Sequence, residues 1–226
     1  MTVILSVVLL TYNRLAYAIK TLNSTLDKLD HDSRLPLHVH IGSDGDTDEY
    51  IAELVQAAKQ YDTVDVVTMS NSQRKGYGAN YNMATQVVHE LSDYALVLED
   101  DWELLRLFDP VKLIEDMKSL SIGCARLGYL GYTQQLRGHL AAGSYCQHWM
   151  VFDPYSPEPH VFAGHPRIES REWSRAVGAW PEGMAPGETE FTVSHRAEAR
   201  RGVAWPVSLV QPHGDLYAHI GTERSY

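Results

Sequence analysis

The chain has 226 residues, of which 44% are hydrophobic, so it is long enough to bury one sizeable core and short for two. Its formal net charge of −10, from 29 acidic and 19 basic residues, argues against broad binding to a phosphate polymer, because such binding needs clustered lysine and arginine. The 2 cysteines form no C-x-x-C pair, so neither a disulfide framework nor a cysteine-rich zinc site is indicated.

The N-terminus lacks the features of a secretion signal. Met1–Leu10 is apolar, but no basic residue precedes a longer apolar run and no small-residue cleavage site follows. Nowhere do about 18 consecutive apolar residues occur, the length that a membrane-spanning helix needs. We therefore expect a cytoplasmic protein without a transmembrane segment, in which residues 1–226 form a single domain.

The first part of the chain predicts strands that alternate with helices. Val3–Leu10 is a nearly continuous aliphatic run, typical of a strand that is covered on both faces. From Leu15 to Leu29 apolar residues recur at steps of three and four, which predicts an amphipathic helix. Leu37–Ile41 is the second predicted strand. These segments form the beginning of a β-α-β-α series.

The alternation continues up to an acidic motif. Asp46 and Glu49 can form a capping box for a second helix, and Val64–Met69 and Ala95–Leu98 are the third and fourth predicted strands. The helix between those strands carries three large apolar side chains, those of Met83, Val87 and Leu91. Such a pattern implies right-handed crossovers and a parallel, doubly wound sheet.

The second half of the chain has a different character. Leu127–Tyr132 and Ser144–Phe152 look extended, with Arg137–Gly143 as a hairpin connection, so mixed or antiparallel strands are expected there. Two loops rich in proline and glycine, Asp153–Pro159 and Pro181–Gly187, are candidate mobile walls of a site. The remaining segments are a helical pattern at Ile168–Val177, another at Thr189–Arg200, and two closing segments, Val203–Val210 and Leu216–Ile220.

Polar residues follow the predicted strands where ligands are expected. In an open α/β sheet, ligands bind outside the carboxyl ends of the strands, where helix N-termini point into the crevice. Four polar sets occupy such positions: Thr11–Arg14, Ser43–Asp46, Arg74–Gly76 and Glu99–Asp101. All four should converge at one edge of the sheet.

The acidic set is the sharpest signal. Glu99, Asp100 and Asp101 directly follow the apolar run of the fourth strand, where their mutual repulsion would be costly. Mn²⁺ or Mg²⁺ would relieve it, because oxygen ligands suit these ions. A solvated acidic turn that caps a helix is the alternative interpretation, and the position after a fourth βα strand disfavours it.

Two of these motifs carry a family resemblance. Ser6–Arg14 (SVVLLTYNR) and Glu99–Asp101 (EDD) resemble the GT-A glycosyltransferases, especially the family-two-like group with an S-V-V-x-x-T-Y-N-R opening and a D-x-D-like motif. The resemblance covers roughly the first hundred residues. It implies a Rossmann-like, doubly wound mixed sheet, mostly parallel, with a nucleotide-sugar-binding half at 1–102 and an acceptor-binding half at 103–226.

The resemblance also implies an activity, which is inverting, metal-dependent transfer of a sugar from a nucleotide diphosphate sugar to an acceptor hydroxyl. The first candidate donor is a UDP-sugar. The acceptor would be a glycan, a small molecule or a hydroxymethylated DNA base, and the acidic net charge disfavours DNA. A divalent metal, Mn²⁺ or Mg²⁺, would be the cofactor.

The same resemblance assigns roles to individual residues. Nucleotide-sugar contacts are implied for Thr11, Tyr12, Asn13, Arg14, Asp44, Arg74, Gly76, Asn80, Glu99 and Asp100. Within this set Asp44 would accept a hydrogen bond from the base, and Arg74 would pair with a phosphate. Asp101 would bind the metal together with a C-terminal histidine, His219 in first place and His213 in second.

A general base is expected at the start of a late helix, because the family places a carboxylate there. This chain has Glu188-Thr189-Glu190 at that point, where the family often has E-D. We favour Glu190 over Glu188. The alternative is that both charges only compensate the dipole of the helix.

Two other functions compete with sugar transfer. A sugar-phosphate nucleotidylyltransferase would need a glycine-rich loop directly after the first strand, and Thr11–Arg14 contains no glycine. A non-catalytic nucleotide-sugar-binding module would be expected to lose its metal acids or its base. The presence of Asp101, Glu188 and Glu190 counts against such a module.

Overall fold

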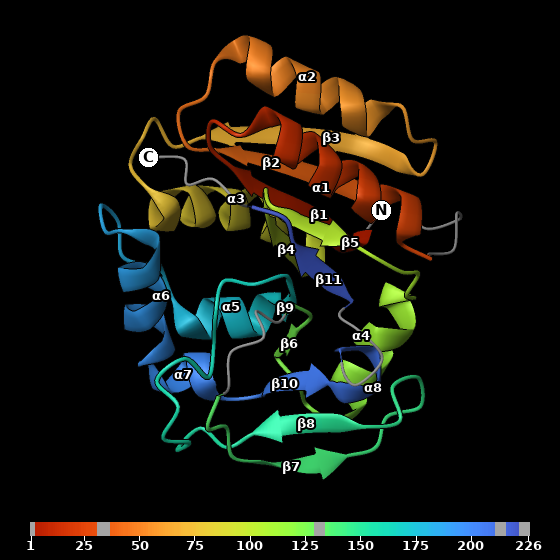
Figure 1. Ribbon diagram of the computed structural model, residues 1–226, viewed down its shortest axis with the longest axis vertical. Helices are drawn as coiled ribbons and strands as arrows, with labels where there is room; N and C mark the ends of the chain where they lie inside the picture. Colours follow the sequence, from red (N-terminus) through yellow and green to blue (C-terminus); the bar gives the residue numbers. More distant parts are fainter. Residues whose placement is uncertain (1–2, 31–36, 129–133, 211–215, 222–226) are drawn as a thin grey trace.

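The first half of the chain alternates strands with helices, in a computed structural model that describes residues 3–30, 37–128, 134–210 and 216–221 (Figure 1). The elements are β1 (Val3–Thr11), α1 (Leu15–Lys28), β2 (Leu37–Ser43), α2 (Asp48–Lys59), β3 (Val64–Asn71), α3 (Tyr77–Leu91) and β4 (Ser92–Glu99). These four strands lie side by side in the order β3-β2-β1-β4, and each neighbouring pair is parallel. The predicted parallel unit is confirmed.

The apolar run of β1 is continuous because both faces of the strand are buried. Val7 and Leu9 pack into one core with residues of α1 and α2, while Val8 and Leu10 pack into a second core with residues of α3. Side chains alternate across a strand, so a strand between two cores needs apolar residues at successive positions. Helices therefore cover both faces of this part of the sheet.

The second half adds mostly antiparallel strands to the same sheet. Its elements are β5 (Trp102–Leu104), α4 (Pro110–Ser119), β6 (Cys124–Arg126), β7 (Gly138–Ala141), β8 (Trp149–Phe152), β9 (Arg167–Ser170), α5 (Arg171–Val177), α6 (Pro186–Ser194), α7 (Ala197–Arg200), β10 (Val203–Pro206), α8 (Val207–Val210) and β11 (Tyr217–His219). Among the described residues, one 9-stranded sheet runs in the order β3-β2-β1-β4-β9-β6-β10-β8-β7. Figure 1 shows α2 and β7 at opposite ends of the long axis.

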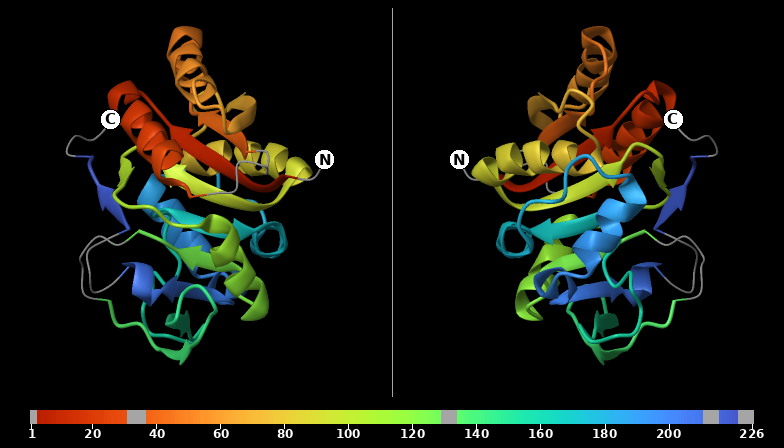
Figure 2. Two further views of the ribbon diagram at one scale, coloured as in Figure 1. Left: turned by 90° about the vertical axis from the view of Figure 1, so that its right-hand side faces the viewer. Right: turned by 90° about the vertical axis from the view of Figure 1, so that its left-hand side faces the viewer.

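A separate pair of strands, β5 and β11, stands beside the main sheet. They are antiparallel, and β5 begins directly after the acidic triplet. Figure 2 shows β11 on the same side of the molecule as α1, away from α3. The last described strand is therefore next to the carboxyl end of β4.

The third helix buries a different face from the one that its largest apolar residues occupy. Met83 and Leu91 are 38% and 39% exposed, while the buried side chains include Tyr81, Ala84 and Val88. A Cβ atom at Gly42 would come within 3.3 Å of the Ala84 Cβ atom, so the helix lies close to the sheet. Small residues are needed at such a contact, so the buried face is not the one with the largest apolar side chains.

The predicted cap of α2 is also wrong by one residue. Thr47 is the N-cap, and its hydroxyl accepts a hydrogen bond from the Tyr50 N–H at 3.3 Å. Asp46 instead accepts from the Asn13 N–H at 2.6 Å and from the Ser43 hydroxyl at 2.7 Å. It links the loops after β1 and β2 rather than starting the helix.

Other boundaries in the second half differ from the predictions. Gly138–Ala141 is β7 itself, paired with β8, so the hairpin connection comes later than Arg137–Gly143. Of the predicted strand at Leu127–Tyr132, residues 129–132 lie outside the described residues, and the observed strand is Cys124–Arg126. The pattern at Thr189–Arg200 divides into α6 and α7, and Val203–Val210 divides into β10 and α8.

The helical pattern at Ile168–Val177 contains a strand that sequence periodicity did not reveal. Ile168 lies in β9, which is antiparallel to both β4 and β6, and the helix begins only after the cap at Ser170. Arg167 and Glu169 form a fully buried ion pair, with 2.9 Å between Nε and Oε2. Two charged residues mark this strand as polar in sequence although it is central in the sheet.

Among the described residues, no helix is both long and apolar enough to cross a membrane.

Two buried histidines on β2 make the fold sensitive to acid. His38 and His40 are fully buried and hydrogen-bond to Ser6, Thr68 and Ser70. Burial lowers the pKa of His38 to about 4 and that of His40 to about 3. The unfolded chain therefore binds more protons than the folded chain once the pH drops below about 6.5, and stability falls with pH.

Between pH 7.5 and 4.5 we expect each of these histidines to lower the free energy of unfolding in urea by roughly 2 kcal/mol. His40→Gln should flatten this dependence, because glutamine does not titrate. His139→Gln is the control, since His139 is exposed, and it should follow the unmodified protein. Parallel pH profiles for all three proteins would contradict this prediction.

Candidate active site

A cavity of about 260 Å³ lies at the carboxyl ends of the parallel strands. All four predicted polar sets contribute to its lining: Thr11, Tyr12 and Arg14 after β1, Asp44 after β2, Gly76 before α3, and Glu99 and Asp100 at the end of β4. The predicted convergence is confirmed. It follows from topology, because the carboxyl ends of neighbouring parallel strands share one edge.

Two of the three acidic residues at this edge, Asp100 and Asp101, are buried. Asp100 and Asp101 are 2% and 5% exposed, so the interpretation as a solvated turn is wrong. Asp100 Oδ2 accepts hydrogen bonds from the Thr11 hydroxyl at 3.0 Å and from the Tyr12 N–H at 3.1 Å. Burial raises the pKa of Asp100 to about 6, although the positive charge of Arg14 opposes this shift.

The pairing of β5 with β11 brings a histidine into contact with Asp101, the last residue of the acidic triplet. His219 pairs with Trp102 in the strand register, and its Nε2 atom lies 3.1 Å from Asp101 Oδ2. The Ile220 N–H donates to the Asp101 carbonyl oxygen at 2.8 Å and fixes the same contact from the backbone. The predicted second histidine, His213, lies outside the described residues.

Asp101 and His219 fit a divalent cation. Two ligands about 2.1 Å from an octahedral ion and at right angles to each other lie about 3.0 Å apart, close to the spacing found here. Asp101 Oδ1 is buried and has no hydrogen-bond partner among the described residues. No three His, Cys, Asp or Glu residues in the described part of the chain are grouped to hold an ion, so further ligands must come from elsewhere.

A second acidic group forms around Gly164. A Cβ atom at this glycine would lie 2.4 Å from Glu190 Oε1, 2.6 Å from the Tyr77 hydroxyl and 2.8 Å from Glu99 Oε1. The Gly164 N–H donates to Glu190 Oε1. Burial and the charge of the other carboxylate raise the pKa of Glu99, and burial raises the pKa of Glu190.

The two glutamates predicted as alternative bases have different environments. Glu190 points at Gly164 and belongs to the group just described. Glu188 is exposed in the first turn of α6, where a negative charge compensates the helix dipole. Only Glu190 is placed next to the acidic end of β4.

Several other predicted residues occupy specific structural positions. Asn80 donates from Nδ2 to the Gly42 carbonyl oxygen at 2.9 Å and ties α3 to β2. Gly76 has a φ of 90°, which favours glycine, and its N–H donates to Asp44 Oδ1 at 3.1 Å. The Ser72 hydroxyl also donates to Asp44 Oδ1. These bonds hold Asp44 on the cavity wall.

Two predicted contacts lie outside the cavity lining. Asn13 is exposed, and its backbone N–H is bound to Asp46. Arg74 is exposed, and its guanidinium lies 5.8 Å from the centre of the Tyr12 ring. Arg74 therefore reaches the outer side of Tyr12. In this arrangement Arg14, rather than Arg74, is the arginine next to the acids.

Sequence reasoning did not single out three of the residues that shape this site. Tyr77 and Met184 line the cavity, and Gly164 is the point on which the oxygens of Tyr77, Glu99 and Glu190 converge. Met184 belongs to the loop Pro181–Gly187, whose Gly183 N–H donates to the Lys75 carbonyl oxygen at 3.2 Å. The proline and glycine content did indicate this loop as a wall, but nothing in the sequence marked Tyr77 or Gly164.

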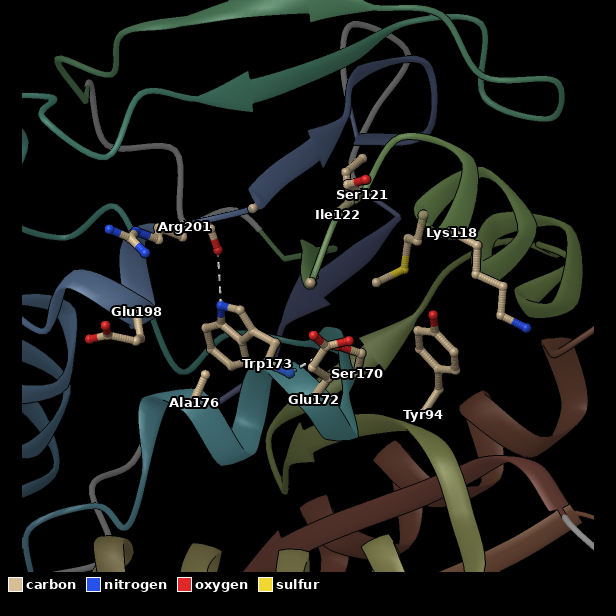
Figure 3. Close-up of a pocket in the computed structure, with 13 residues that line it drawn as sticks. Tyr94, Lys118, Ser121, Ile122, Ser170, Glu172, Trp173, Ala176, Glu198 and Arg201 are labelled. Atoms are coloured by element: carbon tan, nitrogen blue, oxygen red, sulfur yellow. Dashed lines mark hydrogen bonds between the residues drawn. The ribbon is translucent and has the colours of Figure 1, made fainter.

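A larger cavity, of about 530 Å³, lies at the opposite edge of the sheet. Its lining includes Tyr94, Gly123 and Gly202, at the amino ends of β4, β6 and β10. Figure 3 shows Arg201 on one side of this cavity and Lys118 on the other, so their charged groups do not converge. The larger cavity lacks the grouped acids that line the smaller one. We therefore take the smaller cavity as the candidate active site.

A known protein family matches most of the chain. The model of a family described as glycosyl transferase family 2 matches residues 6–170, which include the whole acidic triplet. No curated protein matches the chain.

Solved structures with a similar fold include those of three glycosyltransferases. TarS of S. aureus in complex with UDP-GlcNAc has a TM-score of 0.61 and 16% identity, over 89% of this chain and 55% of that one. GalNAc-T7 with UDP, GalNAc and Mn²⁺ has a TM-score of 0.60 and 15% identity, over 91% and 43%. The mannosyltransferase PcManGT from Pyrobaculum calidifontis, in complex with GDP-Man and Mn²⁺, has a TM-score of 0.56 and 14% identity, over 91% and 57%.

The chain thus spans about half the length of these proteins. At such low identity the likeness establishes the fold, and the predicted GT-A architecture is confirmed.

Proposed function

Because the chain belongs to glycosyl transferase family 2, we propose that it transfers a sugar from a nucleoside diphosphate sugar to an acceptor hydroxyl. The observation that carries this proposal is the contact of His219 with the buried Asp101 at the carboxyl end of β4. An oxygen and an imidazole nitrogen at that spacing suit a divalent ion that also binds a diphosphate. The cavity beside them has room for part of such a donor.

The donor we propose is a UDP-sugar. Asp44 is held on the cavity wall by Ser72 and Gly76, so its carboxylate can accept the imide N–H of uracil. Tyr12 lines the same wall and offers an aromatic surface to the base. Two of the three similar structures, those of TarS and GalNAc-T7, contain uridine nucleotides, which supports the same choice.

The proposed reaction is a single displacement with inversion. Glu190 takes the proton of the acceptor hydroxyl while that oxygen forms a bond to the anomeric carbon, and the bond from this carbon to the diphosphate oxygen breaks. The Gly164 N–H orients the Glu190 carboxylate for this task. When bound by Asp101 and His219, a divalent metal would neutralise the charge of the departing diphosphate.

A ligand panel tests the donor class. We expect UDP with Mn²⁺ to raise the melting temperature by several degrees, since a ligand at about 100 times its Kd stabilises the fold by about 2.7 kcal/mol. GDP, CDP and ADP should give smaller shifts, and UDP without metal a smaller shift as well. Asp44→Ala should lose the preference for uridine, whereas Asp48→Ala, on the exposed start of α2, should keep it.

Two results would contradict the proposal. Stabilisation by nucleoside triphosphates together with sugar phosphates would favour a nucleotidylyltransferase. The absence of any shift across diphosphates and their sugars, with and without Mn²⁺, would show that this cavity binds no such donor.

Gly221 is predicted to be required for the metal site. A Cβ atom at this position would lie 2.3 Å from Asp101 Oδ2 and 2.9 Å from Asp101 Cβ, so Gly221→Ala must displace the carboxylate. We expect Mn²⁺ binding in the presence of UDP to weaken by about tenfold or more, with little change in melting temperature, because ligand geometry sets affinity. Gly187→Ala is the matched control, since nothing lies within 4 Å of a Cβ atom there. Equal Mn²⁺ affinities of the two variants would refute this role.

A further inference from the structure

Arg14 occupies the position of a counter-ion between the two buried aspartates. Its Nη1 atom donates to Asp101 Oδ2 at 2.8 Å, and its Nη2 atom pairs with Asp100 Oδ1. The guanidinium is half-buried and lines the candidate donor cavity. Arg14 therefore links the loop after β1 to both aspartates that follow β4.

This contact competes directly for the proposed metal ligand. Asp101 Oδ2 is approached by Arg14 Nη1 and by His219 Nε2, so the two lone pairs of this oxygen are already engaged. A metal ion held by Asp101 and His219 would replace the hydrogen between them and would be a close neighbour of the guanidinium. Like charges at such a distance repel strongly in a buried site.

The balance of charge depends on whether a donor is present. Arg14, Asp100 and Asp101 together carry one net negative charge, which a divalent cation alone would turn into one net positive charge. A nucleoside diphosphate sugar brings two negative charges and restores the balance. The Arg14 Nε–H is buried and has no hydrogen-bond partner among the described residues, so this N–H group remains available to an anionic ligand.

We propose that Arg14 is a built-in counter-ion that couples the two ligands: it keeps the metal affinity of Asp101 low until a diphosphate binds beside it. This inference rests on the proposed function, because it assumes the metal site at Asp101 and His219. It assigns Arg14 a positioning role toward the acids, whereas the sequence resemblance implied a contact with the nucleotide. In this protein metal and donor bind cooperatively because one arginine links their sites.

The test is a titration of the folded protein with Mn²⁺, followed by the electron paramagnetic resonance signal of free Mn²⁺ at pH 7.5. In the unmodified protein, saturating UDP should tighten Mn²⁺ binding at least about tenfold, because it cancels the repulsion from Arg14. Arg14→Met should bind Mn²⁺ without UDP about tenfold more tightly than the unmodified protein, and UDP should tighten its Mn²⁺ binding by a smaller factor, because the phosphate ligands remain while the repulsion is gone. Arg14→Lys keeps the charge and should keep most of the coupling.

Two further variants test whether the charge of Arg14 causes the coupling. Lys20→Met removes a cation of α1 that pairs with Glu103 at 2.8 Å instead of with Asp100 or Asp101, and it should behave like the unmodified protein. Asp100→Asn lowers the negative charge and leaves Arg14 on Asp101, so it should weaken Mn²⁺ binding without UDP. Circular dichroism establishes that each variant is folded, and Asp100→Asn tests the charge balance even if Arg14→Met does not fold.

The outcomes separate this inference from the proposed function. If Asp101→Asn abolishes Mn²⁺ binding with UDP but folded Arg14→Met binds Mn²⁺ like the unmodified protein, the metal site stands and the role of Arg14 is refuted. Unchanged or tighter Mn²⁺ binding by Asp100→Asn would refute it too. If Asp101→Asn binds Mn²⁺ normally, the metal site is wrong and the inference fails with it.

Discussion

Asp101→Asn is expected to reduce kcat for sugar transfer by about three orders of magnitude. A bound metal stabilises the leaving group in the transition state by several kcal/mol, and each 1.4 kcal/mol lost lowers the rate roughly tenfold. The substitution keeps the shape of the side chain and an oxygen that can accept from Arg14. Asparagine is a poorer ligand for a hard cation than a carboxylate, so Mn²⁺ binding should fall together with activity. The measurement is steady-state transfer with a labelled UDP-sugar at saturating Mn²⁺.

The control for this variant is Asp62→Asn, because Asp62 is exposed in the turn before β3. It should keep nearly full activity. The melting temperature of Asp101→Asn should stay close to that of the unmodified protein, which would place the effect in the site. Full activity of Asp101→Asn in the presence of a chelator would refute a metal-assisted mechanism.

Glu190→Gln is expected to reduce kcat by about 10²- to 10⁴-fold, the usual contribution of a general base. Glutamine can still accept the hydrogen bond from the Gly164 N–H, so the fold around it should survive. Glu188→Gln is the matched control two residues away, and it should act like the unmodified protein because Glu188 is exposed. A large loss in Glu188→Gln with none in Glu190→Gln would reverse the assignment.

The pH dependence of kcat/KM gives a second readout for Glu190. A general base works only when it is deprotonated, so activity should fall on the acid side. Burial raises the pKa of Glu190, and this fall should occur at a higher pH than for an ordinary glutamate. The residual activity of Glu190→Gln should lack this acid limb. An unchanged limb in that variant would assign the titration to another group.

Much of the nucleotide half was determined by local sequence patterns. The aliphatic run of β1 predicted a strand covered on both faces, and Val7 and Val8 do pack into different cores. The alternation of strands and helices predicted a parallel unit, and a parallel unit gathers its carboxyl ends at one edge. The convergence of the loops around Thr11, Asp44 and Glu99 therefore follows from the order of elements, without knowledge of side-chain positions.

The second half was harder to predict because its strands are short and their partners are distant in sequence. β9 carries the charged residues Arg167 and Glu169, which pair with each other inside the sheet, and the sequence pattern there predicted a helix from Ile168 onward. The buried face of α3 is also set by a tertiary contact. Close packing against Gly42 selects small side chains, and a sequence does not state how near a helix lies to its sheet.

By itself, the sequence determined the fold class, the edge at which the acids gather and the short list of residues that could act there. Only the tertiary structure decided how they are arranged: the pairing of β5 with β11 set His219 on Asp101, the Gly164 N–H holds Glu190 beside Glu99, and Arg14 turned to the buried aspartates. The physical reason is that strand patterns are local and repeat along the chain. Ligand geometry and charge balance depend instead on contacts between residues that are distant in sequence, such as His219 and Asp101, which are 118 positions apart.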